Sequence, residues 1–311
     1  MLAMREQVYH HIAKYATPSD IRGVLEFVGT FGAWIAMFSA PWWCIPLHSL
    51  VTLRLFIVGI HDTGHQSLFK TPRLNDYALY ITSPVMWMPG MTLWRPGHNY
   101  HHRHSNDLDF DQSSQTAPLT VREFRNMSWW KRYLYRSLTR PWIVLTQTAP
   151  IGMTLGQLAR IVAPQDALLQ AGFLVLLLWY GVFVRYVLVT CLSASIGVFL
   201  FHLQHTFPEC VRVKGRDSFE NGYSGSSYLV LPEFFKLFTA GIEYHHIHHL
   251  NSRVPSYRLR ICHEEAPEGM WSGIRTITLR EGWNSMDLVL WSEAKEKLVS
   301  FEEVDKEILL T

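Results

Sequence analysis

Histidine is concentrated in four short clusters, and this density constrains the chain more than any other feature. Twelve of the 16 histidines lie in these clusters: His61 and His65; His98, His101, His102 and His104; His202 and His205; and His245, His246, His248 and His249. On a helix, residues at i, i+3 and i+4 share one face, so the imidazoles of one cluster can converge on a point. Imidazole is a common ligand of transition metals. The clusters therefore predict a metal site.

The number of converging imidazoles indicates two ions rather than one. His245, His248 and His249 have the i, i+3, i+4 spacing, and His61 with His65 forms an i, i+4 pair. Eight or nine imidazoles exceed what one tetrahedral or octahedral ion can bind. We therefore expect a dinuclear, nearly all-histidine site. Four isolated histidines are expected to be ordinary, partly solvated side chains: His10, His11, His48 and His263.

The composition is typical of a membrane-embedded chain. Of the 311 residues, 48% are hydrophobic and only 17% are charged, against roughly 25% charged in ordinary soluble domains. The net charge is +2 with acidic and basic residues mixed, so we expect no nucleic-acid partner. The four cysteines have neither CxxC spacing nor a disulfide framework. The N-terminal residues lack the apolar core of a cleavable signal, so the first apolar span is expected to direct membrane targeting.

Four apolar runs predict membrane spans at about residues 24–40, 45–61, 167–184 and 186–202. Each is near the short end of the ~17–25 residues that cross a bilayer. Arg54 in the second run disfavours a lipid-exposed helix and is expected to snorkel or to face the protein interior. The last two runs are interpreted as two spans joined by a tight turn near Arg185. The alternative is one long tilted helix, which would reverse the sidedness of everything downstream.

The distribution of lysine and arginine predicts which span ends share a side of the membrane. Both residues are frequent in 70–140 and in the tail, whereas the 39–47 connection has none. With four spans, the N-terminus, the middle segment and the tail lie together on the cytoplasmic face, where all four histidine clusters meet. The interrupted apolar stretches 77–94 and 142–162 predict interfacial or re-entrant helices. With neither repeat nor linker, residues 1–311 are expected to form a single domain.

Three histidine boxes and their flanking residues resemble the membrane fatty acid desaturases. The boxes read HxxxH from His61, HxxHH from His98 and HxxHH from His245. Four strings carry the resemblance: Arg54 to His65, Trp94 to His102, Gly225-Ser-Ser, and Gly241 to Leu259. It covers roughly residues 45–300 and is greatest to the omega-6 (delta-12) and omega-3 acyl-lipid desaturases. It implies an all-α integral membrane fold with four transmembrane helices and a cytosolic helical cap that holds a di-iron site.

The resemblance implies nine metal ligands, one for each histidine that matches the family's pattern. They are His61, His65, His98, His101, His102, His205, His245, His248 and His249. His202 lies one turn before His205 and is open to two interpretations, a metal ligand or a donor that orients a neighbour. Thr63 stands where the family commonly has cysteine, and we expect this to tune the site rather than abolish it. His104 and His246 fall off the i, i+3, i+4 face and are expected to lie outside the ligand set.

Each ligating imidazole needs a hydrogen-bond acceptor for its second ring nitrogen. Five acidic residues lie beside the boxes and are the candidates: Asp62, Asp107, Asp109, Asp111 and Glu243. For Asp109 and Asp111, a solvated acidic loop is an equal alternative.

The site and the resemblance favour an O2-dependent desaturase that introduces a double bond into a long-chain fatty acyl group of a lipid. Oxidation of an unactivated methylene requires O2 activated at iron, because no side chain is a sufficient oxidant. A fatty acyl or carotenoid hydroxylase, ketolase or acetylenase on the same di-iron scaffold is the alternative. A metal transporter or bis-histidine haem protein would place its histidines inside the spans, whereas these clusters lie at span ends.

The sequence also predicts partners. It contains no flavin, haem or ferredoxin motif, so electrons are expected from a separate donor, cytochrome b5 or ferredoxin with its reductase. The substrate is expected to be an apolar chain drawn from the bilayer into a slot between the spans. Four residues are the expected lining: Met86, Trp87, Met88 and Trp94. Anchoring of these four side chains at the membrane interface is the alternative.

Overall fold

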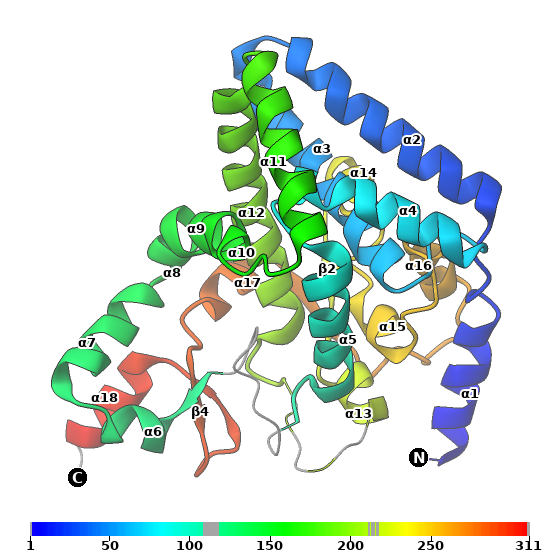
Figure 1. Cartoon of the computed structure of the whole chain (residues 1–311). Coiled ribbons are helices and arrows are strands. Elements are labelled where there is room, and N and C mark those ends of the chain that lie inside the picture. Colours follow the sequence, from blue (N-terminus) through cyan, green and yellow to red (C-terminus); the bar gives the residue numbers. More distant parts are fainter. Residues whose placement is uncertain (1, 108–117, 211, 213–214, 216–217, 310–311) are drawn as a thin grey trace.

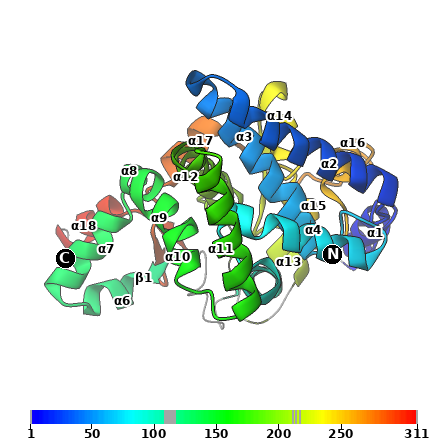
Figure 2. The same ribbon diagram turned by 45° about the horizontal axis from the view of Figure 1, so that its top comes forward.

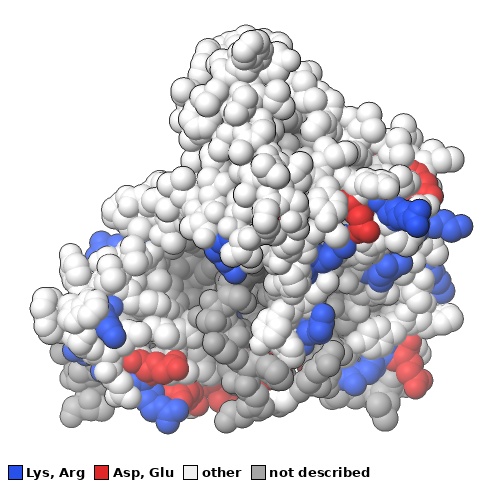
Figure 3. Space-filling model, viewed as in Figure 1, with Lys and Arg blue, Asp and Glu red and all other residues white. Residues whose placement is uncertain are grey.

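A bundle of long apolar helices projects from a broader, mostly helical base (Figure 1). The computed structural model describes residues 2–107, 118–210, 212, 215 and 218–309. Four helices form the bundle: α2 (Asp20–Ala36), α3 (Ile45–Phe56), α11 (Pro164–Trp179) and α12 (Phe183–His205). On the face shown in Figure 3, the projecting end of this bundle carries neither acidic nor basic side chains, and the charged residues lie on the base.

The first two expected spans are present as two long apolar segments. In the first, α2 continues through the 3-10 turn η1 (Met37–Ser39). The second consists of η2 (Trp42–Cys44), α3 and the π-helix η3 (Ile57–Asp62). These segments are 20 and 21 residues long, and their length and apolar composition are sufficient to cross a membrane. Pro41 lies between them, within the expected 39–47 connection.

The third and fourth expected spans differ from their predicted bounds. A turn at residues 180–182 separates α11 from α12, and Gly181 adopts φ +68° there, which a residue without a Cβ accommodates readily. The prediction of two helices is therefore confirmed, and the alternative of one long helix is wrong. The turn precedes Arg185 rather than lying at it. α11 has 16 residues, while α12 has 23 residues and is long and apolar enough to be a membrane span. Because α12 continues to its C-terminal residue His205, His202 lies inside the same helix.

The half-buried Arg54 and the buried Arg185 hold the bundle together. Arg54 donates from Nε to Thr30 Oγ1 at 3.1 Å and forms an ion pair with Glu26, so α3 is tied to α2. As expected, Arg54 faces the protein interior. Arg185 on α12 is 4% exposed, donates to the carbonyl of Ala40 and lies over the ring of Trp42. The start of α12 is thereby joined to the turn between the first two apolar segments.

Short helices make up most of the base. The α-helices are α1 (Leu2–Ala13), α4 (Pro72–Thr82), α5 (Arg95–His104), α6 (Val121–Asn126), α7 (Trp129–Leu138), α8 (Pro141–Ile143), α9 (Ala149–Met153), α10 (Leu155–Leu158), α13 (Ser218–Tyr223), α14 (Glu233–Thr239), α15 (His245–Leu250), α16 (Ser256–Glu264), α17 (Leu279–Ser285) and α18 (Phe301–Leu309). The 3-10 turn η4 (Pro84–Met86) and the π-helices η5 (Gly90–Trp94) and η6 (Val144–Thr148) connect some of them.

Five short strands within the described residues correct the expectation of an all-helical chain. They are β1 (Leu119–Thr120), β2 (Ser227–Val230), β3 (Arg275–Thr278), β4 (Leu290–Ser292) and β5 (Lys297–Val299). β4 lies between β1, which is parallel to it, and β5, which is antiparallel. β2 and β3 form a separate parallel pair with Ser227 opposite Arg275. The chain is therefore mostly helical, with two small sheets in the base.

Four apolar side chains shortly before the second histidine box are buried in the protein rather than exposed at its surface. Met86, Trp87, Met88 and Trp94 are between 3% and 8% exposed. Trp87 stacks on Tyr186 of α12 with ring centroids 5.4 Å apart. Anchoring at the membrane interface is therefore the wrong interpretation for these four side chains. They form part of the apolar core between the bundle and the base.

Candidate metal centre

The first histidine box lies where α3 becomes the π-helix η3. His61 belongs to η3, and the amide of His65 donates to the carbonyl of His61 at 3.1 Å, so the two rings stay one turn apart. Thr63 donates from Oγ1 to the carbonyl of Gly59 at 2.7 Å within this wide turn. π-helical turns are often found at functional sites, since the extra residue redirects side chains. Here the turn directs both imidazoles into the base.

The second box occupies α5, which approaches the first box closely. Arg95 at its start pairs with Asp76 at 2.8 Å and donates to the carbonyl of Thr63 at 3.2 Å. The indole of Trp94 stacks on His98 with centroids 4.3 Å apart and an interplanar angle of 21°. A Cβ on Gly64 would lie 2.2 Å from Trp94, so only glycine allows this approach. These contacts fix where His98 and the following turn of α5 point.

The third box is the short helix α15, and the last residue of α12 meets it. The chain reaches α15 through Ala240 and Gly241, which have φ of 51° and 93°. His205 at the end of α12 donates from Nδ1 to the carbonyl of Gly225 at 3.3 Å. This hydrogen bond leaves Nε2 of His205 directed at the other boxes.

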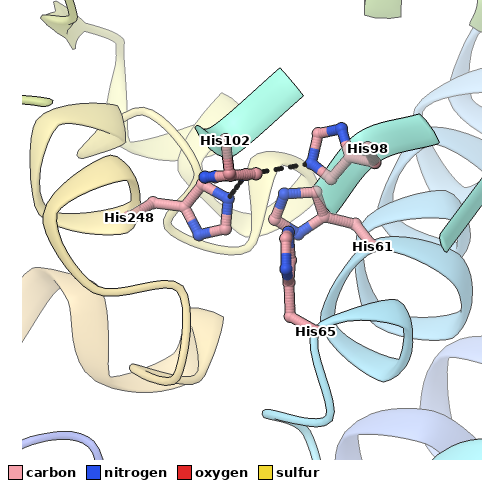
Figure 4. Close-up of side chains that lie close together, drawn as sticks. All are labelled: His61, His65, His98, His102 and His248. Carbon is pink, nitrogen blue, oxygen red and sulfur yellow. Dashed lines mark hydrogen bonds between the residues drawn. The ribbon is translucent and has the colours of Figure 1, made fainter. Parts of the chain in front are cut away.

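Five imidazoles from all three boxes form one group (Figure 4). Its members are His61, His65, His98, His102 and His248, whose potential ligand nitrogens all lie within 4.8 Å of one another. Nε2 of His102 is 3.2 Å from Nε2 of His98 and 3.0 Å from Nε2 of His248. In Figure 4 the five rings point toward a common centre from three separate segments of the chain.

A second group adjoins the first. His101, His205 and His249 place their potential ligand nitrogens within 4.8 Å of one another. His245 joins them, because its Nε2 lies 2.9 Å from Nε2 of His205. The groups touch where His102 of the first stacks on His249 of the second at 4.2 Å. The two groups together contain the nine histidines that the sequence singled out.

The surroundings of these rings fit a pair of cations. Burial, reinforced by the neighbouring imidazoles, holds the pKa of His65, His98, His102 and His248 well below the usual value for histidine. Burial also lowers the pKa of His101 to about 4. The rings are therefore neutral at physiological pH, with lone pairs available to a metal. Among the described residues, the buried Nε2 atoms of His61, His65 and His249 have no hydrogen-bond partner, as expected of atoms that hold a metal.

One expected carboxylate orients a box histidine. Oδ1 of Asp62 lies 3.0 Å from Nδ1 of His61, and its Oδ2 accepts from the amide of Ser256 at 2.8 Å. Glu243 instead accepts a hydrogen bond from Thr239 at 2.6 Å, and burial raises the pKa of its carboxyl group. Asp107 is buried, while Asp109 and Asp111 lie outside the described residues. The carbonyl of Gly225 accepts the hydrogen bond from His205, whereas the sequence predicted only carboxylates as acceptors.

His202 lies outside both groups. Its Nε2 donates to the carbonyl of Ser285 at 3.1 Å, which ties α12 to α17. The extra imidazoles of the second and third boxes also lie elsewhere: His104 packs on Tyr100, and His246 is 3.2 Å from Nδ1 of His263. Neither group includes the isolated histidines of the chain.

Comparisons with known proteins give one family and several relatives. Residues 40–274 match the family model described as fatty acid desaturase. A fatty acid desaturase of Bacillus subtilis is 26% identical over 331 residues, covering 96% of this chain and 92% of the relative. An sn-1 oleoyl-lipid 12-desaturase of Synechocystis is 27% identical over 73% of this chain and 70% of the relative. An sn-1 acyl-lipid omega-3 desaturase (ferredoxin) of Synechocystis is 29% identical over 38% of this chain and 34% of the relative.

Proposed function

The chain belongs to the fatty acid desaturase family, and from this premise we propose that it introduces a double bond into a long-chain acyl group of a membrane lipid in an O2-dependent reaction. The proposed regiochemistry is omega-6 (delta-12)-like, since relatives named oleoyl-lipid 12-desaturase and omega-6 fatty acid desaturase match 73% and 92% of the chain. The observation that carries the proposal is the convergence of nine buried or partly buried histidines into two adjoining groups. Membership of the family makes the chain an oxidoreductase.

The nine histidines would hold two irons. His61, His65, His98, His102 and His248 would bind one, and His101, His205, His245 and His249 the other. When bound, the iron pair would supply the O2 activation that removal of hydrogen from an unactivated methylene requires. The protein contributes the fixed positions of the rings, through Asp62 at His61 and the Gly225 carbonyl at His205. Because these ligands are neutral imidazoles and not carboxylates, they would not offset the positive charge of the bound metals.

The proposed membrane arrangement has four crossings, by α2, α3 with η3, α11 and α12. At 1.5 Å per residue, the 16 residues of α11 extend ~24 Å, somewhat less than the ~30 Å hydrocarbon core. α11 is therefore the short crossing of the four. The base would form one domain with the bundle and lie on the cytoplasmic side, where the excess of lysine and arginine favours it.

The apolar core beside the first histidine group is the proposed site for the acyl chain. Trp94 stacks on His98 and belongs to the same buried cluster as Met86, Trp87 and Tyr186. An acyl chain that displaced part of this packing would run from the metal-binding histidines toward the bundle. The depth available to its methyl end would then select the carbon pair presented to the metals.

Electrons would come from a separate one-electron carrier, ferredoxin or cytochrome b5, with its reductase. The name of the omega-3 relative includes ferredoxin, which supports that donor for this chain.

Expression in a host that lacks polyunsaturated lipids tests the proposed reaction. Fatty acids are converted to methyl esters and analysed by mass spectrometry, and we expect a new diunsaturated product with the second double bond at the omega-6 position. His245→Ala is the inactive control, and His10→Ala, at an exposed position outside both groups, is the matched active control. A hydroxy or keto acid without a new double bond would contradict desaturation and identify the hydroxylase or ketolase outcome.

A further inference from the structure

Helix α7 presents an apolar, aromatic face to its surroundings. Trp130, Tyr133, Leu134 and Leu138 have the i, i+3, i+4, i+8 spacing of one helix face, and their side chains are between 47% and 71% exposed. Trp129 borders this face and is 76% exposed. Exposed aromatic residues concentrated on one helix indicate a binding surface, since isolated exposed residues are common but contiguous patches are not.

The opposite face of α7 is fixed to the C-terminal part of the base. Tyr135 donates to the carbonyl of Val289 at 2.9 Å, and Arg136 pairs with Asp305 through two contacts of 2.8 and 3.0 Å. Arg136 also lies 4.8 Å above the ring of Phe301. These contacts leave α7 no freedom to turn its apolar face inward. Figure 2 shows α7 with α6 and α18 at one side of the molecule, away from α2 and α4.

The segment that carries the apolar face is basic, and the acidic partner of its Arg136 comes from α18. From Phe124 to Gln165 the sequence contains no aspartate or glutamate. The same segment has six basic residues: Arg125, Lys131, Arg132, Arg136, Arg140 and Arg160. Lys131, Arg132 and Arg140 are exposed, and the ammonium of Lys131 lies 5.5 Å from the centre of the Trp130 ring. A basic helix with an aromatic face matches the chemistry of an anionic lipid surface.

The apolar face also continues toward the bundle. Trp142, Ile151 and Leu155, on the short helices that follow α7, are between 54% and 61% exposed. This segment is attached to α12 by a hydrogen bond of 2.6 Å from Ser195 Oγ to the carbonyl of Leu145. The exposed surface of residues 129–155 therefore adjoins a helix that is apolar and long enough to cross a membrane.

We propose that residues 129–155 form a lipid-docking surface that lies in the headgroup layer of an anionic phospholipid membrane. The aromatic rings insert at the level of the headgroups, and Lys131, Arg132 and Arg140 contact lipid phosphates. Contact with a second copy would bury these cations in an interface core, from which lysine is usually depleted. Because α7 is attached to β4 and α18, the surface holds the C-terminal part of the base against the membrane. The inference rests on the membrane location included in the proposed function.

Spin labels on the full-length protein in vesicles test the docking surface. Tyr133→Cys and Leu134→Cys probe α7, Val28→Cys probes the exposed face of α2, and Glu268→Cys probes an exposed turn of the base. The labelled wild-type chain corrects for its own cysteines, three of which are buried. The ratio of collisions with O2, which enters lipid, to collisions with a water-soluble nickel chelate reports the surroundings of each label.

In vesicles of phosphatidylcholine and phosphatidylglycerol, we expect the ratio at positions 133 and 134 to resemble that at 28 and to exceed that at 268 several-fold. Low ratios at 133 and 134 with a high ratio at 28 would overturn the docking surface alone. A low ratio at 28 as well would overturn the membrane location itself. Dipolar broadening between labels at position 133 would identify a second copy as the occupant and also overturn the proposal.

Charge reversal tests the requirement for anionic lipid. Lys131→Glu combined with Arg132→Glu should lower the ratio at position 133 several-fold while leaving the ratio at 28 unchanged. Vesicles of phosphatidylcholine alone should reduce the ratio at 133 in the unmodified background. Equal ratios in the two lipid compositions would contradict the electrostatic part of the proposal.

Discussion

Asp62 and His61 are neighbours in the sequence whose side chains bond to each other, with Asp62 Oδ1 3.0 Å from Nδ1 of His61. The same carboxylate accepts from the amide of Ser256 through its other oxygen. It thus links a candidate metal ligand to the start of α16, immediately after the third histidine box. Removal of the charge should affect the orientation of the ring as well as its basicity.

Asp62→Asn should therefore lower the affinity for iron by roughly 10–100-fold, the usual effect of losing such a partner. Titration of the purified variant against a competing chelator measures the affinity. Asp287→Asn, at an exposed position, is the control and should bind iron as the native protein does. Native affinity in Asp62→Asn would show that the carboxylate does not support His61 as a ligand.

His202→Leu should leave the iron content unchanged, because the imidazole bonds to the Ser285 carbonyl and not to either histidine group. The lost hydrogen bond should lower the free energy of unfolding by about 1 kcal/mol. His205→Leu is the matched change one turn along α12 and should reduce the iron content. Metal analysis of both variants, with thermal unfolding, separates the two roles, and iron loss in His202→Leu would make His202 a ligand.

Gly64→Ala should destabilise the first histidine group. The added Cβ would lie 2.2 Å from Trp94, so the indole that stacks on His98 must move. Overpacking of this kind lowers stability by about 1–3 kcal/mol. Thermal unfolding and iron content are the measurements. Gly29→Ala is the matched control and should be neutral or slightly stabilising, because the described residues beyond its own helical backbone place no atom within 4 Å of the added Cβ.

The metal-free protein should lose stability as the pH falls below about 6.5. Burial lowers the pKa of His101 from 6.5 to about 4 and depresses the pKa of His65, His98, His102 and His248. The unfolded chain therefore binds more protons between these values, and the free energy of unfolding must decrease as the pH decreases through that window. The stability is fully present above 6.5. Unfolding midpoints of iron-free protein across the window measure the slope, which His101→Gln should reduce; a flat profile would contradict burial of neutral rings.

Labelling of single introduced cysteines in sealed vesicles should place the two parts of the base on one side. Arg122→Cys and Glu268→Cys should react with an impermeant maleimide from the same side, and Trp43→Cys from the opposite side. Trp43 is 80% exposed in the turn between the first two apolar segments, so its replacement should not disturb the fold. Reaction of positions 122 and 268 from opposite sides would exclude the four-crossing arrangement.

The nine histidines could be predicted to lie near one another because helical spacing is a local property. His98 with His102 on α5, and His245 with His249 on α15, are i, i+4 pairs, and each pair stays within one group. The division of each box between the two groups does not follow from spacing, because His101 faces His205 and His248 faces His102, on other segments of the chain. The direction of His202 could not be predicted in this way. Its ring bonds to the carbonyl of Ser285, 83 residues away, and such a backbone partner leaves no signal in the sequence.

Other differences have physical causes of the same kind. The strands of the two sheets have two to four residues, too few to show the alternation that identifies a strand. Glu243 lies beside the third box in sequence but is bonded to Thr239 one turn earlier, because the chain reverses at Gly241. Tryptophan is typical of anchors at the membrane interface, yet Trp87 and Trp94 are buried in the apolar core between the bundle and the base. Burial of an aromatic residue depends on packing partners distant in the sequence.

The spread of the candidate ligands along the chain has a consequence for how the protein is made. The first group draws on His61, His65, His98, His102 and His248, so its last member is synthesised 187 residues after its first. The bundle helix α12, which ends at His205, is also complete before His248 leaves the ribosome. Neither group can be finished during insertion of the early helices. Loading of the proposed iron pair must therefore follow translation of the third box, and a chain truncated before α15 should reach the membrane without the ability to retain those irons.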